Sequence, residues 1–237
     1  MLIKDLGICL ARSEYSETSQ LATIFSREHG KIRGIAKGAR RTKSKFGQGI
    51  ELLSRGQVVF SQPRSGTGLI TLTEWAVQES YPQIRRSLRQ LYRGYYLAEL
   101  VDLFTEELDP HQQLFDLLDK GLADLGAKEN QGGLLAFQMA LLQEVGLSPE
   151  LKTCGRCGKE PQDYVSFTEG GVLCRVCAAA AVEKSRISLA GLEVLRKITS
   201  SQTSEPAAQP AKQAQQILSY WIRSALNREP KTAHLLR

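Results

Sequence analysis

The sequence has no run of about 18 consecutive apolar residues, which is the length that a membrane-spanning helix needs. Its most apolar stretch, residues 134–142, is interrupted by Gln138. Near the start, Asp5 and Arg12 fall inside the segment that would form the apolar part of a secretory signal, and no small-residue cleavage site follows. We therefore expect neither a membrane span nor a signal peptide, and we predict a cytoplasmic protein.

Histidine is scarce, and the common catalytic motifs are missing. The three histidines, His29, His111 and His234, lie in separate segments. There is no G-x-S-x-G, no phosphate-binding glycine loop ending in Lys-Ser or Lys-Thr, and no H-E-x-x-H. Carboxylates such as Glu106 and Glu107 are spaced as on a solvated surface, without the cluster that a metal-dependent nuclease needs. We predict that the protein is not an enzyme.

The sequence does have an excess of positive charge, and this excess is unevenly distributed. The 237 residues include 31 Lys and Arg against 25 Asp and Glu, a net charge of +6. By segment, residues 1–80 carry 12 basic and 7 acidic residues, residues 81–152 carry 7 and 11, and residues 153–237 carry 12 and 7. Charge asymmetry of this kind indicates a partner more than a fold. A polyanion is the expected partner.

Residues 1–80 have the pattern of short strands separated by turns. Apolar and β-branched residues gather in five runs: 6–11, 21–26, 32–36, 58–61 and 69–77. The interval between the third and fourth runs is long, as in the Greek-key OB barrel, whose chain crosses one end of the barrel at that point. A five-stranded OB-fold barrel is therefore predicted, with an SH3-like barrel as the alternative.

From Tyr81 onward the pattern becomes helical. Pro82 suits a helix start, and apolar residues then recur at intervals of three and four as far as Phe104. Further helices are predicted at 114–125, 134–145, 178–184, 188–197 and 213–226, with a flexible loop at 199–211. The predicted fold class is α+β: an OB-fold nucleic-acid-binding domain over residues 1–80, then a helical domain over 81–237.

Four of the five cysteines form two C-x-x-C pairs inside the helical domain, in an insertion at 152–178. Cys154 and Cys157 are followed after 16 residues by Cys174 and Cys177, the spacing of a four-thiolate structural zinc site. Two disulfides and a redox pair are the competing interpretations, and a cytosolic chain without a thioredoxin-like setting disfavours both. One structural Zn²⁺ is predicted. Cys9 lies in an apolar run and is predicted to be a core residue.

Basic residues are concentrated between Arg27 and Lys45, where Glu28 is the only acidic residue. On an OB barrel this segment would cover strands two and three and the loop after them, where flexible cations follow phosphates. Phe46 and Tyr15 could each stack on a base there, or each could instead plug an end of the barrel. The predicted DNA contacts are Arg27, Lys31, Arg33, Lys37, Arg40, Arg41, Lys43 and Lys45, Arg64 in a later loop, and Arg85, Arg89 and Arg93 at four-residue spacing on the first helix. The last three could instead pair with the acidic helices that follow.

Two stretches of the barrel and the cysteine insertion together carry a family resemblance. Residues 16–26 (SETSQLATIFS) and 30–40 (GKIRGIAKGAR), with CGRCG at 154–158 and Gly170-Gly171-x2-Cys174-x2-Cys177, resemble the bacterial RecO family of DNA repair proteins over nearly the whole chain.

This resemblance implies a recombination mediator of the RecF pathway. Such a protein binds single- and double-stranded DNA and anneals complementary strands. It contacts the C-terminal tail of single-strand-binding protein, and with RecR it promotes loading of RecA onto coated DNA. The residues alone leave another class open, a zinc-stabilised RNA-binding or transcription-associated structural protein.

Overall fold

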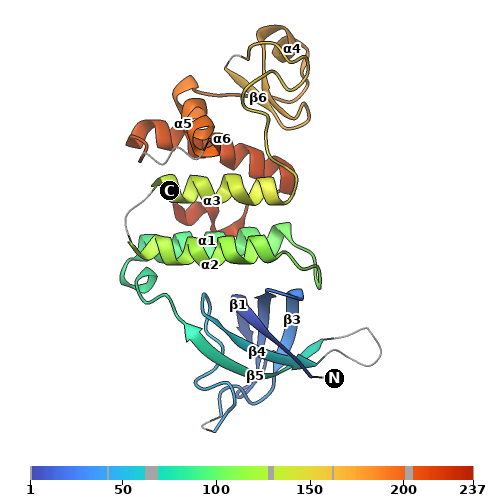
Figure 1. Ribbon diagram of the computed structural model, residues 1–237, viewed down its shortest axis with the longest axis vertical. Coiled ribbons are helices and arrows are strands. Elements are labelled where there is room, and N and C mark those ends of the chain that lie inside the picture. The colour runs from blue at the N-terminus through green and yellow to red at the C-terminus, as the bar shows by residue number, and fades with distance from the viewer. Residues whose placement is uncertain are drawn as a thin grey trace. The chain divides into compact units, whose positions relative to one another are not determined.

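The computed structural model describes residues 2–41, 43–61, 69–127, 131–161, 163–200 and 205–236. The chain divides into two compact units, one formed by Met1–Lys128 with Lys231–Arg237 and the other by Glu129–Pro230 (Figure 1). Across the described ranges, every helix falls short of the length and apolar character needed to cross a bilayer. The predicted boundary of the nucleic-acid-binding domain at residue 80 stays a prediction.

The first unit contains a closed barrel of five strands, as predicted. They are β1 (Leu2–Glu14), β2 (Gln20–Ser26), β3 (Gly30–Ala36), β4 (Arg55–Ser61) and β5 (Ile70–Glu79). Around the barrel the order is β1-β2-β3-β5-β4, and β1 closes it by pairing with β4. All neighbours are antiparallel except β3 and β5, which are parallel. This is the OB fold, and the α+β class is confirmed.

Alternating side chains fill the barrel. Ile24, Ile32 and Val58 point inward and are fully buried. Cys9 belongs to the same core, as predicted, and its burial raises the pKa of its thiol to about 12. A register shift in β1 between Cys9 and Ala11 marks a β-bulge, beyond which the strand continues as an exposed extension to Glu14.

The chain between β3 and β4 closes one end of the barrel. Ala39, Phe46 and Ile50 are each less than 5% exposed and belong to the barrel core. Its backbone is held at two points, because the Arg40 amide donates to the Thr18 carbonyl in the turn between β1 and β2, and the Lys45 carbonyl accepts from the Trp75 amide on β5. Of the two roles left open for Phe46, stacking on a base or plugging a barrel end, the structure shows the second, since its ring is buried in the barrel core.

The first unit also contains η1 (Ile84–Arg86), α1 (Leu88–Phe104), α2 (Gln112–Ala127) and the C-terminal turn η2 (Lys231–Leu236). The turn η2 packs on α1, where Glu99 accepts hydrogen bonds from the amides of Lys231 and Thr232. The rings of Phe25 on β2 and Phe115 on α2 lie 6.2 Å apart. α1 approaches the barrel through Gly94, where an added Cβ would lie 2.7 Å from a methyl group of Leu53. α1 and α2 therefore belong to the same compact unit as the barrel.

The single helix predicted from Pro82 to Phe104 is interrupted. Ser87 is extended, with φ −135° and ψ 124°, and it separates η1 from α1. Arg85 consequently does not continue the helical stripe of Arg89 and Arg93, which corrects the prediction of three cations on one helix face.

The second unit combines three helices with a small module that carries the cysteines (Figure 1). The helices are α3 (Gln131–Glu144), α5 (Leu189–Thr199) and α6 (Ala208–Leu226); the module contains β6 (Tyr164–Ser166), β7 (Gly171–Leu173), α4 (Arg175–Ala180) and β8 (Ser185–Arg186). Its strands pair in the order β7-β6-β8. The three long helices follow the predicted periodicity.

Two boundaries in the second unit differ from the sequence prediction. The helix predicted at 178–184 is α4, which begins directly after Cys174 and ends at Ala180. The ammonium group of Lys184 lies beyond it and binds the carbonyls of Ala178 and Ala181 at 2.5 and 3.2 Å, so it completes the end of α4. The loop predicted at 199–211 is shorter, because α6 already starts at Ala208 with Pro210 in its first turn, where proline is tolerated.

Candidate nucleic-acid interface and four-cysteine centre

A hollow of about 300 Å³ lies on the outer face of β1, β2 and β3. It is lined by Ala11, Arg12, Ser13, Leu21, Ala22, Thr23, Arg33, Gly34 and Leu69. The strand register brings these residues together, since Thr23 on β2 lies opposite Ala11 on one side and Arg33 on the other. Small side chains form its floor and two arginines lie among its walls. This is the face on which OB barrels bind their ligands.

Arg33 was among the predicted DNA contacts, whereas Arg12 was missed. Arg12 stands alone in the sequence of β1, and only the pairing of β1 with β2 brings it close to the cations of β3. The Arg33 guanidinium is about half exposed and lies 3.2 Å from a carboxylate oxygen of Glu107 and 3.6 Å from Asp102. Both arginines thus reach the hollow, one of them already paired with carboxylates.

Three further predicted cations are exposed next to β3. Lys37, Arg41 and Lys43 follow the strand. Within the described part of the chain they have no acidic partner. The neighbouring cations Arg40 and Lys45 do have acidic partners, since Arg40 binds Glu14 at 2.7 Å and Lys45 pairs with Glu74.

Two members of the predicted set are buried. Lys31 is 4% exposed, and its ammonium group binds the carbonyls of Asp102 and Thr105 at 2.5 and 2.6 Å and the Asp102 carboxylate at 3.1 Å. Arg93 is 5% exposed and donates to Gln90 at 3.4 Å. Neither side chain can reach a phosphate in this conformation, so both are removed from the candidate DNA contacts.

The remaining predicted cations lie around the barrel and the start of α1. Arg27 forms a two-pronged pair with Asp116 at 2.9 and 3.1 Å. This hydrogen bonding raises the pKa of Arg27 and lowers that of Asp116. Arg85 donates to the Leu52 carbonyl at 2.9 Å, and Arg89 is exposed on α1. Arg64 lies outside the described residues.

Of the two aromatic side chains proposed to stack on bases, only Tyr15 is accessible. It is 61% exposed in the turn between β1 and β2, where its amide donates to the Ser19 carbonyl. Since Phe46 is buried, most of the attraction that this face offers a nucleic acid comes from its cations rather than from ring stacking.

Asp5 organises a polar cluster that the sequence did not indicate. Its carboxylate, almost fully buried, accepts hydrogen bonds from the Ser26 hydroxyl, the Glu28 amide at 3.0 Å and His29 Nδ1 at 2.8 Å. Ser26 and His29 both bind Oδ2 of Asp5. In a Ser–His–Asp nucleophile relay the histidine lies between the serine and the carboxylate, so this arrangement is different. The cluster fixes the turn between β2 and β3.

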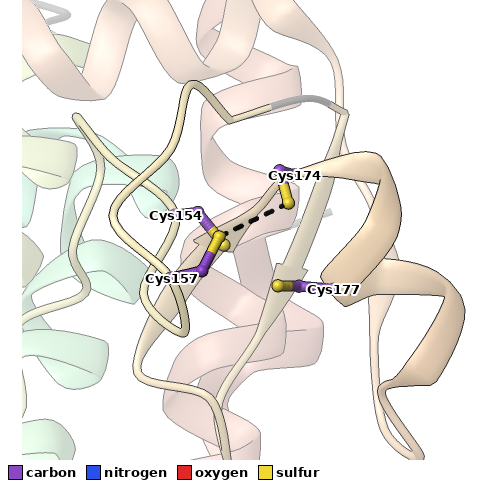
Figure 2. A group of neighbouring side chains, drawn as sticks. All are labelled: Cys154, Cys157, Cys174 and Cys177. Carbon is purple, nitrogen blue, oxygen red and sulfur yellow. Dashed lines mark hydrogen bonds between the residues drawn. The ribbon is translucent and has the colours of Figure 1, made fainter.

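The four cysteines of the insertion converge on one point. Their sulfur atoms all lie within 4.8 Å of one another, and Sγ of Cys157 and Cys174 are 3.7 Å apart. Figure 2 shows the sulfurs turned toward a common centre, two from the first knuckle and two from the start of α4 and the residue before it. Such a group of thiols can hold a metal ion.

Glycines allow the first knuckle to turn tightly beside the second. A Cβ at Gly155 would lie 2.4 Å from the Glu169 carbonyl oxygen, and Gly158 has a φ of +69°. Only glycine fits the first position without movement, and it is favoured at the second. The CGRCG sequence is thus required by the geometry of the knuckle.

Backbone amides of the knuckles also act on the thiols. Burial raises the pKa of Cys154, but hydrogen bonds from the backbone of Cys174, Cys157 and Arg156 outweigh it and bring the pKa down to about 6. The pKa of Cys177 moves the other way, to about 12, through hydrogen bonding with Cys157 and through burial. Opposite shifts are expected where neighbouring thiols interact strongly.

These features together define an OB-fold protein with exposed cations around a hollow on the β1–β3 face, and with a small module in which four cysteines converge. The chain belongs to the Recombination protein O family. The family's N-terminal model matches residues 1–81, and its C-terminal model matches residues 85–234.

Curated relatives agree with this assignment. The chain is 33% identical over 201 residues to the DNA repair protein RecO of Moorella thermoacetica, which covers 83% of this chain and 74% of that protein. It is 29% identical over 235 residues to the protein of the same name from Myxococcus xanthus, covering 98% and 96%. The RecO protein of Bacillus pumilus is 34% identical over 198 residues, covering 83% and 76%.

Proposed function

We propose that the chain is a DNA repair protein acting as a recombination mediator. In this proposal the barrel binds single- and double-stranded DNA and the protein anneals complementary strands. With RecR, it then promotes RecA loading on DNA coated with single-strand-binding protein, whose C-terminal tail it contacts. Family membership supports the role in DNA repair; the partners follow from the family resemblance. Such a protein works in the cytoplasm and catalyses no bond cleavage.

The observation that carries the proposal is the hollow on the β1–β3 face with cations around it. Arg12 and Arg33 line the hollow, and Lys37, Arg41 and Lys43 are exposed on the chain that leaves β3. Lysine and arginine attract the phosphate backbone irrespective of sequence. A protein that must act on any broken or gapped DNA needs this kind of recognition.

The same surface explains how annealing would proceed without nucleotide hydrolysis. Two DNA strands repel each other through their phosphates, and a cationic surface that binds both lowers that repulsion. Base pairing then provides the free energy, and salt-sensitive contacts allow the product to leave. The chain's part is to hold the strands and release them.

We also propose that Cys154, Cys157, Cys174 and Cys177 bind one structural Zn²⁺. Four sulfurs at about 2.3 Å from a central zinc ion lie about 3.8 Å from one another in a regular tetrahedron, and Cys157 and Cys174 are already 3.7 Å apart. When bound, the ion would cross-link the two knuckles. The core of the module is small, consisting of three of the cysteines (Cys154, Cys174 and Cys177) with Leu173, Ala178 and Ala181, so this cross-link would contribute much of its stability.

The decisive experiment is annealing of complementary oligonucleotides coated with single-strand-binding protein, with and without RecR. The wild-type chain should accelerate annealing. The double variant Arg41→Glu/Lys43→Glu should lose most of that acceleration while its melting temperature is unchanged, because both side chains are exposed. A matched control is Lys120→Glu/Lys197→Glu, which changes the net charge equally but on α2 and α5, rather than on the chain that follows β3.

The result could also contradict the proposal. If the barrel variant anneals as fast as the wild type at low salt, the assigned face is wrong. If the wild-type chain binds matched single-stranded RNA much more tightly than DNA and does not accelerate annealing, the alternative of an RNA-binding structural protein is favoured.

A further inference from the structure

Several of the cations on the proposed DNA-binding face form ion pairs with carboxylates of the same chain. Arg33 lies 3.2 Å from Glu107, Arg40 lies 2.7 Å from Glu14, and Lys45 pairs with Glu74. The three acids come from the connection between α1 and α2, the end of β1, and β5. The basic segment between Arg27 and Lys45 contains one acid in sequence, but the fold supplies the missing negative charge from elsewhere.

Two of these pairs, Arg33–Glu107 and Arg40–Glu14, join exposed groups. The side chains of Arg33 and Glu107 are 52% and 55% exposed, and those of Arg40 and Glu14 are 44% and 66% exposed. Exposed ion pairs contribute little to stability. These carboxylates can therefore be displaced by another anion at small cost to the fold.

The acid groups resemble the ligand in charge and in hydrogen bonding. A carboxylate offers a guanidinium two acceptor oxygens, as a phosphate does, and arginine binds both in the same way. Arg33 lines the hollow, so a phosphate bound there competes with the Glu107 carboxylate for the guanidinium. A DNA contact made through Arg33 or Arg40 thus competes with an internal partner.

We propose that Glu107 and Glu14 are competitors of DNA phosphate that set the affinity of this face. In the free protein they form ion pairs with Arg33 and Arg40, and these ion pairs form again when the DNA strand dissociates. Lys37, Arg41 and Lys43, which have no acidic partner in the described residues, make the first contacts. The proposal rests on DNA binding by the barrel, and it adds that two acidic residues weaken this binding and favour release.

Neutralising the acids tests this idea, because it should improve binding. Glu107→Gln and Glu14→Gln keep the size of the side chain and remove its charge. Each variant should bind a short oligothymidine about two- to fivefold more tightly than the wild type at low salt, the range expected for losing one exposed ion pair.

Asp124→Asn is the matched control. Asp124 pairs with Lys120 within α2, so its neutralisation raises the net charge by the same amount without freeing Arg33 or Arg40. Its effect on the affinity should be smaller than twofold. If Glu107→Gln and Glu14→Gln gain no more affinity than Asp124→Asn, the competition is refuted even though the face binds DNA.

A double-mutant cycle identifies the arginine involved. In the Arg33→Gln background, Glu107→Gln should no longer tighten binding, because the arginine that it would release is gone. An undiminished gain in that background would overturn the assignment. If instead the wild-type chain fails to bind oligothymidine at all at low salt, the proposed function fails, which is a separate outcome. Melting temperatures of all variants show whether each is folded.

Discussion

The ammonium group of Lys31 donates a hydrogen bond of 2.6 Å to the backbone carbonyl of Thr105, directly after the last residue of α1. A second bond reaches the carbonyl of Asp102 at 2.5 Å, so a cation from the barrel satisfies carbonyls that the end of the helix leaves unpaired. The Lys31 carbonyl in turn accepts from the Leu108 amide at 3.0 Å. The lysine of the basic strand is thus a structural link between barrel and helix.

Replacing Lys31 should therefore affect stability more than DNA binding. Lys31→Met removes a buried cation and leaves the carbonyls and the Asp102 carboxylate with fewer partners, at a cost of about 2–4 kcal/mol. Lys37 is exposed and follows the last residue of β3. The variant Lys37→Met should leave the unfolding free energy within about 0.5 kcal/mol of the wild type and weaken binding to single-stranded DNA. Urea denaturation measures the stability of each variant, and fluorescence anisotropy with a labelled oligonucleotide measures its DNA affinity. If both variants lose the same amount of DNA affinity, Lys31 contributes to DNA binding and this prediction is wrong.

Replacing Phe46 should lower the stability of the protein, whereas replacing Tyr15 should weaken DNA binding. Phe46→Ala opens a cavity at the barrel end and should destabilise the protein by about 3–5 kcal/mol, with Phe46→Leu costing less. Tyr15→Ala removes an exposed ring and should leave melting unchanged, while weakening binding to single-stranded DNA by about 1 kcal/mol if the ring stacks on a base. Calorimetry and titration with oligothymidine are the measurements. A stable Phe46→Ala variant with reduced DNA affinity would contradict the buried position of the ring.

The sequence predicted most of the elements because their signals are local. The apolar and β-branched runs at 21–26 and 32–36 fall in strands that are largely buried, and three- and four-residue periodicity reflects helices with one buried side. The four cysteines were also predictable from spacing alone, and the structure brings all four together. Patterns repeated within one element therefore give reliable predictions here.

The candidate site was harder to predict because its electrostatics depend on residues far apart in the chain. The burial of Lys31 follows from Asp102 and Thr105, more than 70 residues away. Glu107 reaches Arg33 over a similar separation. Such pairs leave no signature in a local window, so a dense run of basic residues was interpreted as uniformly available when its members are buried, paired or free.

The four-cysteine module gives a prediction about metal content. The purified chain should carry one zinc ion, measured by mass spectrometry of the metal, and chelation should lower the melting temperature. Cys157→Ser should lose the ion, even though Cys157 is the exposed member of the group. Cys9→Ala is the matched control, because Cys9 lies in the barrel core and should affect stability without affecting zinc. Full zinc content in Cys157→Ser would exclude the four-thiolate site.

Tyr81 gives a prediction about stability at high pH. It is 3% exposed at the end of the barrel segment, has a φ of +46°, and its hydroxyl donates to Asp119, which also accepts from Arg55. Burial, and then the hydrogen bond to Asp119, raise the pKa of Tyr81 above its ordinary value of about 10. A raised pKa means that the folded state holds the proton more tightly than the unfolded state. The stabilisation is therefore complete below about pH 10 and falls as the pH rises above it.

The comparison with Tyr81→Phe isolates this contribution from the titration of lysines, which both proteins share. Near pH 8 the variant should be less stable than the wild type by about 1–2 kcal/mol, because Asp119 loses a buried donor. Above pH 10 the tyrosine of the unfolded wild-type chain ionises, so the difference between the two proteins should shrink. Urea denaturation at pH 8, 9.5 and 10.5 measures it. A difference that stays constant or grows over this range would show that Tyr81 does not hold its proton through the contact with Asp119.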